Sequence, residues 1–254
     1  MSEKNTERFS NRVEDYVKYR PHYPKQIITL LHEDFHIDKQ GYPAVADIGA
    51  GTGISAELFL KAGFEVKGVE PNKEMREKAA ALLRDYINFT AIDGTAETTG
   101  LPDKAVDLII AGQAFHWFDR QLAKQEFKRI LKDEGYVLLI WNERLTRSDF
   151  EKEYEALIVR HGNSYLKVDH RNIHLEDIQA FFAPGAVTLR TLDNDQAFDF
   201  DGLKGRLLSS SYMPSVADPG YTAMISDLKD LFDHHQKAGS IKINYETNVY
   251  IGRF

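Results

Sequence analysis

The chain has 254 residues, of which 43% are hydrophobic and 28% are charged, values that are ordinary for a globular protein. Its net charge of −7 argues against general binding of nucleic acid. It contains no cysteine, which excludes disulfides, thiolate metal sites and a thiol nucleophile. The N-terminal sequence is too polar for a secretory signal, and no apolar run is long enough to span a bilayer, so we expect a soluble cytoplasmic protein.

The first half of the chain alternates between strand-like and helix-like stretches, which predicts a parallel sheet covered by helices. The expected strands, which are short apolar runs that end in turn residues, are 42–49, 64–70, 87–93, 105–112 and 136–142. The expected helices, which have apolar residues at helical spacing, are about 24–36, 54–63, 72–86 and 119–135.

The second half has a different pattern. Residues 144–183 are mostly helical and rich in charges and histidines. They have no place in the predicted sheet, and we interpret them as a helical lid insertion. The stretches 186–200 and 241–252 read as strands that form an antiparallel hairpin at the sheet edge, separated by helices at 201–211 and 221–235. The predicted fold is α/β: a Rossmann-like, doubly wound, seven-stranded sheet, mostly parallel with an antiparallel last strand and helices on both faces.

We expect one domain over 1–254. Its predicted parts are an N-terminal helical cap (1–40), a cofactor-binding core (41–143), the lid (144–183) and a C-terminal part that completes the sheet (184–254).

The segment "HEDFH" at 32–36 matches the H-E-x-x-H signature of zinc proteases. A catalytic zinc also needs a third protein ligand, and the extended motif would place a histidine at position 42, where this chain has Tyr42. The helix of about 24–36 ends at the motif, so His32, Glu33 and His36 fit its solvated edges. We therefore expect a solvated helix and assign no metal site.

The segment "VADIGAGTGIS" at 45–55 follows a predicted strand and opens a helix. Gly49 and Gly51 permit a tight turn and a close approach of the backbone to a ligand, and the helix presents free N–H groups. A dinucleotide loop requires G-x-G-x-x-G, but here the third glycine arrives one residue early and Ile54 takes its position. G-x-G-x-G after an Asp-containing strand is instead the pattern for S-adenosylmethionine.

Glu70 ends the second expected strand, 17 residues beyond Gly53. An acid at this place can accept hydrogen bonds from both hydroxyls of a ribose, and such charged hydrogen bonds contribute roughly 1.5–3 kcal/mol. Pro71, Asn72 and Met75 follow at the start of the next helix, where an adenine can rest on Met75. The alternative for Met75 is an ordinary place in the core.

Four segments, taken together and in this order, resemble the class I S-adenosylmethionine-dependent methyltransferases of the type 11-like group: "DIGAGTG", "GVEPNKEM", "IDGTAETTGLP" and "VDLIIAGQAFHWFD". The resemblance covers about residues 40–143. It implies that Gly49, Ala50 and Gly51 contact the methionine part of the cofactor and that Glu70 binds the ribose. It also implies that Thr95 and Ala96 contact the adenine, and that Gln113 and Ala114 lie beneath the sulfonium. Many relatives have aspartate where this chain has Thr95, so the contact between a carboxylate and the adenine amine has no counterpart here.

The N-terminal segment "YVKYRPHYP" at 16–24 resembles the opening of the trans-aconitate methyltransferase-like branch. That resemblance implies that Tyr16, Tyr19 and Arg20 cover the cofactor, with Arg20 paired to its carboxylate. The alternative, from the residues alone, is an N-terminal helix that packs on the core, with Arg20 as a surface charge.

The segment "AFHWFD" at 114–119 places three aromatic residues and a histidine at the end of the fourth expected strand. Aromatic faces can stabilise a sulfonium cation or hold a substrate, at roughly 0.5–2 kcal/mol each. His116 is a candidate general base, with simple packing as the alternative.

These patterns predict methyl transfer from S-adenosylmethionine to a small-molecule acceptor by in-line displacement, in which the protein mainly aligns the reactants and excludes water. The acidic charge and the absence of an Asn/Asp-Pro-Pro-Tyr run argue against a nucleic-acid acceptor. Two alternatives remain: an NAD-dependent oxidoreductase, against which Ile54 counts, and a non-catalytic nucleoside-binding module. The sequence does not predict the oligomeric state.

Overall fold

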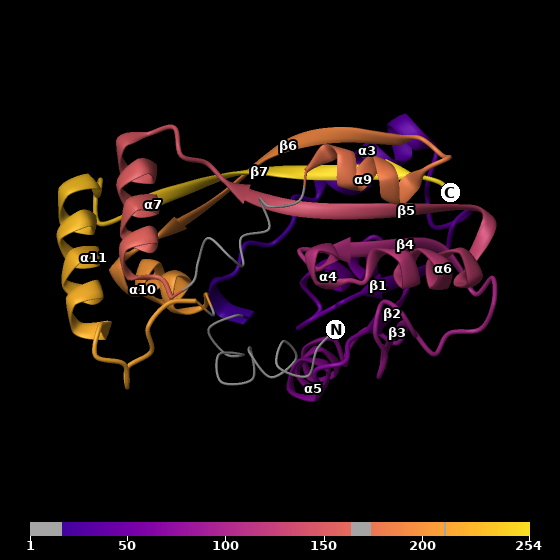
Figure 1. The fold of residues 1–254 in the computed structure, drawn as a ribbon, viewed down its shortest axis with the longest axis horizontal. Coiled ribbons are helices and arrows are strands. Elements are labelled where there is room, and N and C mark those ends of the chain that lie inside the picture. The colour runs from indigo at the N-terminus through magenta and orange to yellow at the C-terminus, as the bar shows by residue number, and fades with distance from the viewer. Residues whose placement is uncertain (1–16, 164–173, 211) are drawn as a thin grey trace.

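The computed structural model describes residues 17–163, 174–210 and 212–254. Seven strands form one sheet in the order β3-β2-β1-β4-β5-β7-β6 (Figure 1). Their bounds are β1 Ala44–Ile48, β2 Glu65–Val69, β3 Phe89–Ile92, β4 Val106–Gly112, β5 Leu131–Arg144, β6 Val187–Phe198 and β7 Ile241–Gly252. β7 alone runs antiparallel to its neighbours, so the predicted sheet and its antiparallel last strand are confirmed.

The burial of the strands explains their sequences. β1 is buried at every residue and β4 at all but its last, as a parallel sheet covered on both faces requires, and each is apolar except for one aspartate, Asp47 or Asp107. β6 lies at the sheet edge and alternates between half-buried and exposed residues. The β6–β7 pair, from Val187 opposite Gly252 to Phe198 opposite Ile241, is the predicted hairpin.

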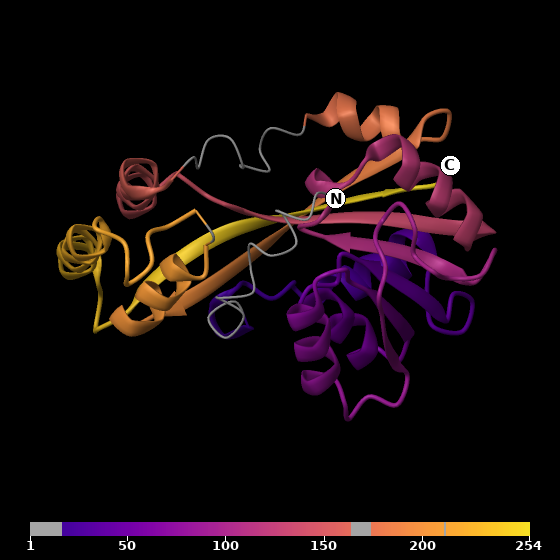
Figure 2. The same ribbon diagram turned by 60° about the horizontal axis from the view of Figure 1, so that its bottom comes forward.

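Helices cover both faces of the sheet, as Figure 2 shows, with α6 and α9 on one side and α4 and α5 on the other. Their bounds are α3 Gln26–Phe35, α4 Ile54–Lys61, α5 Lys73–Leu82, α6 Arg120–Ile130, α7 Asp149–His161, α9 Leu175–Phe182, α10 Phe200–Leu208 and α11 Tyr221–His235. In the part of the chain that the structure describes, no helix combines the length and apolar character needed to cross a bilayer.

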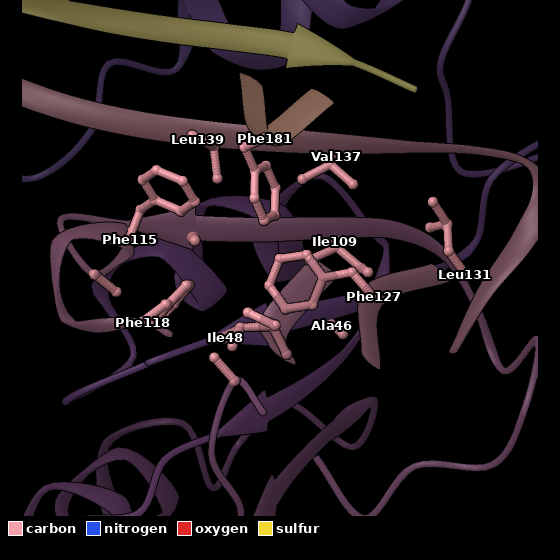
Figure 3. Close-up of a cluster of buried hydrophobic side chains, with 14 of the residues drawn as sticks. Ala46, Ile48, Ile109, Phe115, Phe118, Phe127, Leu131, Val137, Leu139 and Phe181 are labelled. Carbon is pink, nitrogen blue, oxygen red and sulfur yellow. The ribbon is translucent and has the colours of Figure 1, made fainter. Parts of the chain in front are cut away.

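One apolar cluster lies between the sheet and helices α6 and α9. Figure 3 shows Phe115, Phe127 and Phe181 pointing toward one another over β4 and β5. The ring centroids of Phe115 and Phe181 are 4.8 Å apart and those of Phe127 and Phe181 are 5.9 Å apart, in edge-to-face arrangements. Phe181 belongs to α9, so this helix is part of the core of the sheet.

This packing corrects the prediction of one helical lid over 144–183. α9 packs on the sheet beside α6, whereas α7 packs against α11 at the far end of the β6–β7 hairpin (Figure 2). The apolar faces of the two helices are buried in different clusters. The charged residues and histidines on their exposed sides made these apolar faces hard to recognise in the sequence. His170 and Arg171, which the lid was expected to contain, lie outside the described residues.

A second correction concerns the predicted helix at 119–135. Asp119 is its cap, as expected, but α6 ends at Ile130 and the chain continues directly into β5, where Leu131 pairs with Val106. Gly135, expected as the helix terminator, instead lies in this strand, where a Cβ atom would be 2.7 Å from the carbonyl oxygen of Asp107. The glycine is required by close strand contact.

We use the name helical end for α7, α10 and α11, which pack around one apolar cluster with the ends of β6 and β7. In Figure 1 the helical end is at the left, and the arrowheads of β4 and β5 point toward it. In open parallel sheets ligands bind outside the carboxyl ends of the strands. The helical end therefore faces the edge of the sheet where the glycine-rich segment lies.

Candidate functional site

The turn between β1 and α4 is built from three glycines with positive φ: Gly49 at +70°, Gly51 at +57° and Gly53 at +88°. The backbone N–H groups of Gly49 and Ala50 both donate to the carbonyl of Val69, at 2.9 and 3.2 Å, which fixes the turn to β2. A Cβ atom at Gly49 would lie 2.7 Å from that of Ala114. A side chain at residue 49 therefore has no space in this turn.

Glu70 connects the glycine turn to the next helix. Its Oε2 accepts a hydrogen bond of 2.9 Å from the backbone N–H of Gly51, and its Oε1 accepts one of 2.8 Å from that of Asn72. Burial raises the pKa of this carboxyl, and the two backbone hydrogen bonds partly offset the rise. Each oxygen can accept a further hydrogen bond, so a ribose diol can be held here without displacing the turn.

The start of α5 forms as the sequence predicts. The Asn72 side chain caps the helix by accepting a hydrogen bond of 2.9 Å from the backbone N–H of Met75. Met75 is buried, and its sulfur lies 3.8 Å from where a Cβ atom at Gly51 would be. Arg76 donates to the carbonyl of Pro71 at 3.2 Å, and this positions the turn before the helix.

Two buried polar residues of this turn have no assigned role in the sequence prediction. Asp47 is fully buried, and its Oδ2 accepts a hydrogen bond of 2.6 Å from the Ser55 hydroxyl. Burial raises the pKa of Asp47 to about 7, against the effect of that bond. In the described part of the chain neither Oδ1 of Asp47 nor the Thr52 hydroxyl has a hydrogen-bond partner. The signal was the acidic residue within an otherwise apolar strand.

Thr95 and Ala96 lie in the loop after β3. The Thr95 hydroxyl accepts hydrogen bonds from the backbone N–H groups of Glu97 and Thr98, at 3.3 and 3.2 Å, so it organises a turn. Ala96 is buried in the cluster of Figure 3. A contact of either residue with adenine stays a prediction.

Gln113 joins the end of β4 to that of β5. Its backbone N–H donates to the carbonyl of Ile140 at 2.9 Å and its Nε2 to that of Asn142 at 3.0 Å. Its φ of +56° is strained for a residue with a side chain, and such strain is common at ligand sites. Ala114 follows, buried beneath Gly49. The structure therefore brings the predicted residues of β1 and β4 together.

The aromatic segment after β4 divides into two parts. Phe115 and Phe118 are buried in the core, and their contact with a cofactor or substrate stays a prediction. His116 and Trp117 are half-buried neighbours whose ring centroids are 4.7 Å apart. His116 thus keeps a place at the carboxyl end of β4, and its role as a base stays a prediction.

The N-terminal candidates contact the helical end. The ring of Tyr19 lies against Gly205 of α10, where any side chain would collide with it. Arg20 donates a hydrogen bond of 3.1 Å to the carbonyl of Ser209. These contacts join residues 19–20 to α10 and its cap, and their contact with a cofactor stays a prediction. Tyr16 lies outside the described residues.

Asn142, at the end of β5, is a connection that the sequence prediction missed. Its Oδ1 accepts hydrogen bonds from the Thr247 hydroxyl at 2.5 Å and from Asn194 Nδ2 at 3.1 Å. Asn194 Nδ2 also reaches the carbonyl of His22 at 2.8 Å. A buried amide therefore ties β5, β6, β7 and the N-terminal segment together. The available signal was a polar residue that ends the apolar run "YVLLIW".

The HEDFH segment does not form a cluster of ligands. His32, Glu33 and His36 are all exposed, and His36 is the left-handed cap at the end of α3, with φ of 56°. His32 lies 3.9 Å from Asp38. The described residues contain no group of three potential metal ligands, and the assignment of no metal stays a prediction.

Comparison with known proteins identifies the domain around this site. Residues 46–139 match the methyltransferase domain family. An uncharacterized methyltransferase of Mycobacterium tuberculosis is 34% identical over 159 residues, which are 61% of this chain and 60% of that protein.

Two solved structures share the fold. A candidate type II methyltransferase of Anaeromyxobacter dehalogenans superposes with a TM-score of 0.68 at 20% identity, over 92% of this chain and 98% of that one. A phosphoethanolamine N-methyltransferase of Haemonchus contortus, solved with phosphomonomethylethanolamine and S-adenosylhomocysteine, has a TM-score of 0.56 at 17% identity, over 98% and 58%. Residues 46–139 of this chain therefore form a methyltransferase domain.

Proposed function

We propose that the protein transfers a methyl group from S-adenosylmethionine to a small-molecule acceptor. The observation that carries the proposal is the glycine turn at Gly49–Gly51, where the backbone N–H of Gly51 donates a hydrogen bond to the buried carboxylate of Glu70. The matched domain and its S-adenosylhomocysteine-bound structural relative support the choice of cofactor. The match spans 60% of the Mycobacterium relative, so the activity of the whole chain is part of the proposal.

The residues present suit this cofactor. A Cβ atom at Gly49 would collide with that of Ala114, so only glycine fits at this place in the turn. Gly49, Ala50 and Gly51 would hold the methionine part, Glu70 the ribose, and Met75 one face of the adenine. The remaining predicted contacts are those of Pro71, Asn72, Thr95, Ala96, Gln113, Ala114, Tyr19 and Arg20.

The bound cofactor supplies an electrophilic methyl group on a sulfonium. We propose in-line displacement, for which this chain aligns the acceptor and excludes water. Gln113 is hydrogen-bonded to the end of β5, and Ala114 lies next to the glycine turn. In this proposal His116, which follows them, would accept a proton from the acceptor. The helical end, which faces this edge of the sheet, would cover the acceptor.

No observation favours the alternatives. Ile54 begins α4 at the position where a dinucleotide loop has its third glycine. The intact glycine turn and Glu70 count against a non-catalytic nucleoside-binding module. The small-molecule acceptor, the exclusion of nucleic acid and the cytoplasmic location remain predictions.

An acceptor screen tests the activity. The protein is incubated with methyl-labelled S-adenosylmethionine and a panel of small hydroxyl, amine and carboxylate compounds, and release of S-adenosylhomocysteine is measured. We expect release to depend on one acceptor class and to be lost in Gly49→Ala. Equal release by the wild type and this variant would contradict the assignment of the turn.

A further inference from the structure

Arg206 is a buried cation without an acidic partner. It lies on α10, is 7% exposed, and its Nε donates a hydrogen bond of 3.2 Å to the Tyr245 hydroxyl. Its Nη1 lies 3.5 Å from the Ser209 hydroxyl and 3.4 Å from that of Ser210. Over residues 17–163, 174–210 and 212–254, no carboxylate is within ion-pair distance and Nη2 makes no hydrogen bond.

The groups around Arg206 do not neutralise it. They are the tyrosines Tyr154, Tyr212 and Tyr245, of which Tyr154 and Tyr245 are 1% exposed. Burial raises the pKa of Tyr154 to about 12, so this phenol stays neutral at physiological pH. A guanidinium that is buried without a counter-charge is costly, because it has lost its water without gaining an anion.

The nearest acidic residues on α7 are already in use. Glu155 forms an ion pair with Arg144, whose guanidinium lies over the Tyr154 ring at 5.2 Å. Glu151 accepts hydrogen bonds from the backbone N–H groups of Arg147 and Ser148, and from the Asn244 side chain. The pair of Arg144 and Glu155 cancels, so Arg206 leaves one positive charge in this cluster.

Two connections place this charge beside the candidate active site. Arg144 is the last residue of β5, two residues beyond Asn142, whose carbonyl accepts the hydrogen bond from Gln113. On the other side, the Tyr245 hydroxyl donates to Gln196 at 3.1 Å, and Gln196 donates to the carbonyl of Tyr19 at 3.3 Å. The cluster therefore borders the segment that runs past the carboxyl end of the sheet.

We propose that Arg206, together with the hydroxyl of Tyr154, binds the anionic group of the methyl acceptor, which is a carboxylate or a phosphate, and that the Tyr245 hydroxyl orients the guanidinium. This inference rests on the proposed function, because it concerns the acceptor of the proposed methyl transfer. The free Nη2 of Arg206 supplies a directed donor, and a guanidinium and a phenol hydroxyl together match the several acceptor oxygens of such a group.

Titration calorimetry with two simple anions tests the proposal. The protein is first saturated with S-adenosylhomocysteine and then titrated with inorganic phosphate and, separately, with succinate. We expect the wild type to bind at least one of them and Arg206→Met to bind it at least tenfold more weakly. The matched control is Arg190→Met, which removes an exposed arginine that pairs with Asp34 on the outer surface, and its affinity should stay within twofold.

The two anions distinguish a carboxylate from a phosphate as the anionic group of the acceptor. Binding of succinate alone indicates a carboxylate acceptor, and binding of phosphate alone indicates a phosphorylated one. Arg206→Lys should lose succinate binding more strongly than phosphate binding, because lysine lacks the planar fork that pairs with a carboxylate. No binding of either anion by the wild type, or equal binding by Arg206→Met, would overturn the proposal.

A milder variant keeps the test decisive if Arg206→Met does not fold. Tyr245→Phe removes only the hydroxyl that orients Arg206, and we expect about three- to tenfold weaker anion binding with S-adenosylhomocysteine affinity unchanged. Unchanged anion affinity in this variant would contradict the proposal. Failure of the wild type to bind S-adenosylhomocysteine in the first step would instead contradict the proposed function.

Discussion

The glycine turn and the helical end both contain buried charged groups, but they hold them by different means. Glu70 is fixed by two backbone N–H groups within the segment 51–72. Arg206 is surrounded by side-chain hydroxyls from α10 and from β7, the latter 39 residues further along the chain. The first arrangement depends on local backbone conformation, and the second on the packing of distant elements.

This difference explains what each region is suited to do. A site made of backbone groups accepts few changes of sequence and suits a ligand that never varies, which is the cofactor. A site made of side chains on packed helices can change with single substitutions. We therefore expect substitutions in the turn to affect cofactor binding and substitutions in the helical end to affect only the acceptor.

Gly49→Ala should have the largest effect. The new Cβ atom would lie 2.7 Å from that of Ala114, at a φ of +70° that alanine rarely adopts, so the turn must shift. We expect S-adenosylhomocysteine affinity to fall about a hundredfold or more. Gly239→Ala is the control, because Gly239 has a φ of +77° but no atom within 4 Å of the added Cβ. Similar losses in both variants would exclude a specific role for the turn.

Asp47→Asn tests the buried acid beneath the turn by its pH dependence. The Asp47 pKa is about 7 in the native state and about 4 in the unfolded chain. Between these values the unfolded chain has lost the proton and the native state keeps it, so raising the pH destabilises the wild type. From pH 5 to 7.5 the variant should gain on the order of 3 kcal/mol in unfolding free energy relative to the wild type.

Urea unfolding at these two pH values measures the gain, with the exposed Asp34→Asn as control. If the difference in unfolding free energy between Asp47→Asn and the wild type does not change with pH, Asp47 is ionised in the native state.

The buried acid Glu126 affects stability in a lower pH range than Asp47. Burial raises its pKa, but the hydrogen bonds from Arg129 and Thr99 outweigh burial and lower it to about 2. Its stabilising contribution is therefore lost only below about pH 4.5.

Glu70→Ala should weaken S-adenosylhomocysteine binding about ten- to hundredfold, the equivalent of roughly 1.5–3 kcal/mol. The variant removes both the expected ribose contact and the acceptor for the Gly51 and Asn72 backbone groups. Glu65→Ala, at the exposed beginning of the same strand, is the control. Retention of full affinity in Glu70→Ala would show that the ribose binds elsewhere.

His116→Ala should have the smallest effect on cofactor binding, within a few-fold, while lowering turnover with the acceptor found in the screen. If His116 is the base, the wild-type rate rises with pH through one ionisation, and the variant lacks that step. Identical pH–rate profiles would reduce His116 to a packing role beside Trp117.

The sequence was informative where structure is local. The glycine turn, the Asn72 cap, α11 and β7 were predicted because their signals lie within a few residues of each other. The end of α6 was wrong because the pairing of Leu131 with Val106, 25 residues away, overrides helical periodicity. The burial of Phe115 in the core was not predicted, because α9, which packs on it, comes from a segment that was interpreted as a lid.

Asn142 and Arg206 were missed for the same reason, since their partners lie on other elements. A signal for Arg206 did exist. It is a charged residue three positions after Leu203 and beside Leu207, on the buried side of α10. A charged residue on the apolar face of a helix is seldom fully buried unless it is paired, so its presence there indicates a partner that the sequence alone does not show.

The turn at Gly49–Gly51 and the carboxylate of Glu70 should select S-adenosylhomocysteine and reject NAD. Titration of the wild-type protein with each of these ligands tests this directly. Calorimetry should give one S-adenosylhomocysteine bound per chain and no saturable binding of NAD. Saturable binding of NAD, with no response to S-adenosylhomocysteine, would contradict the account.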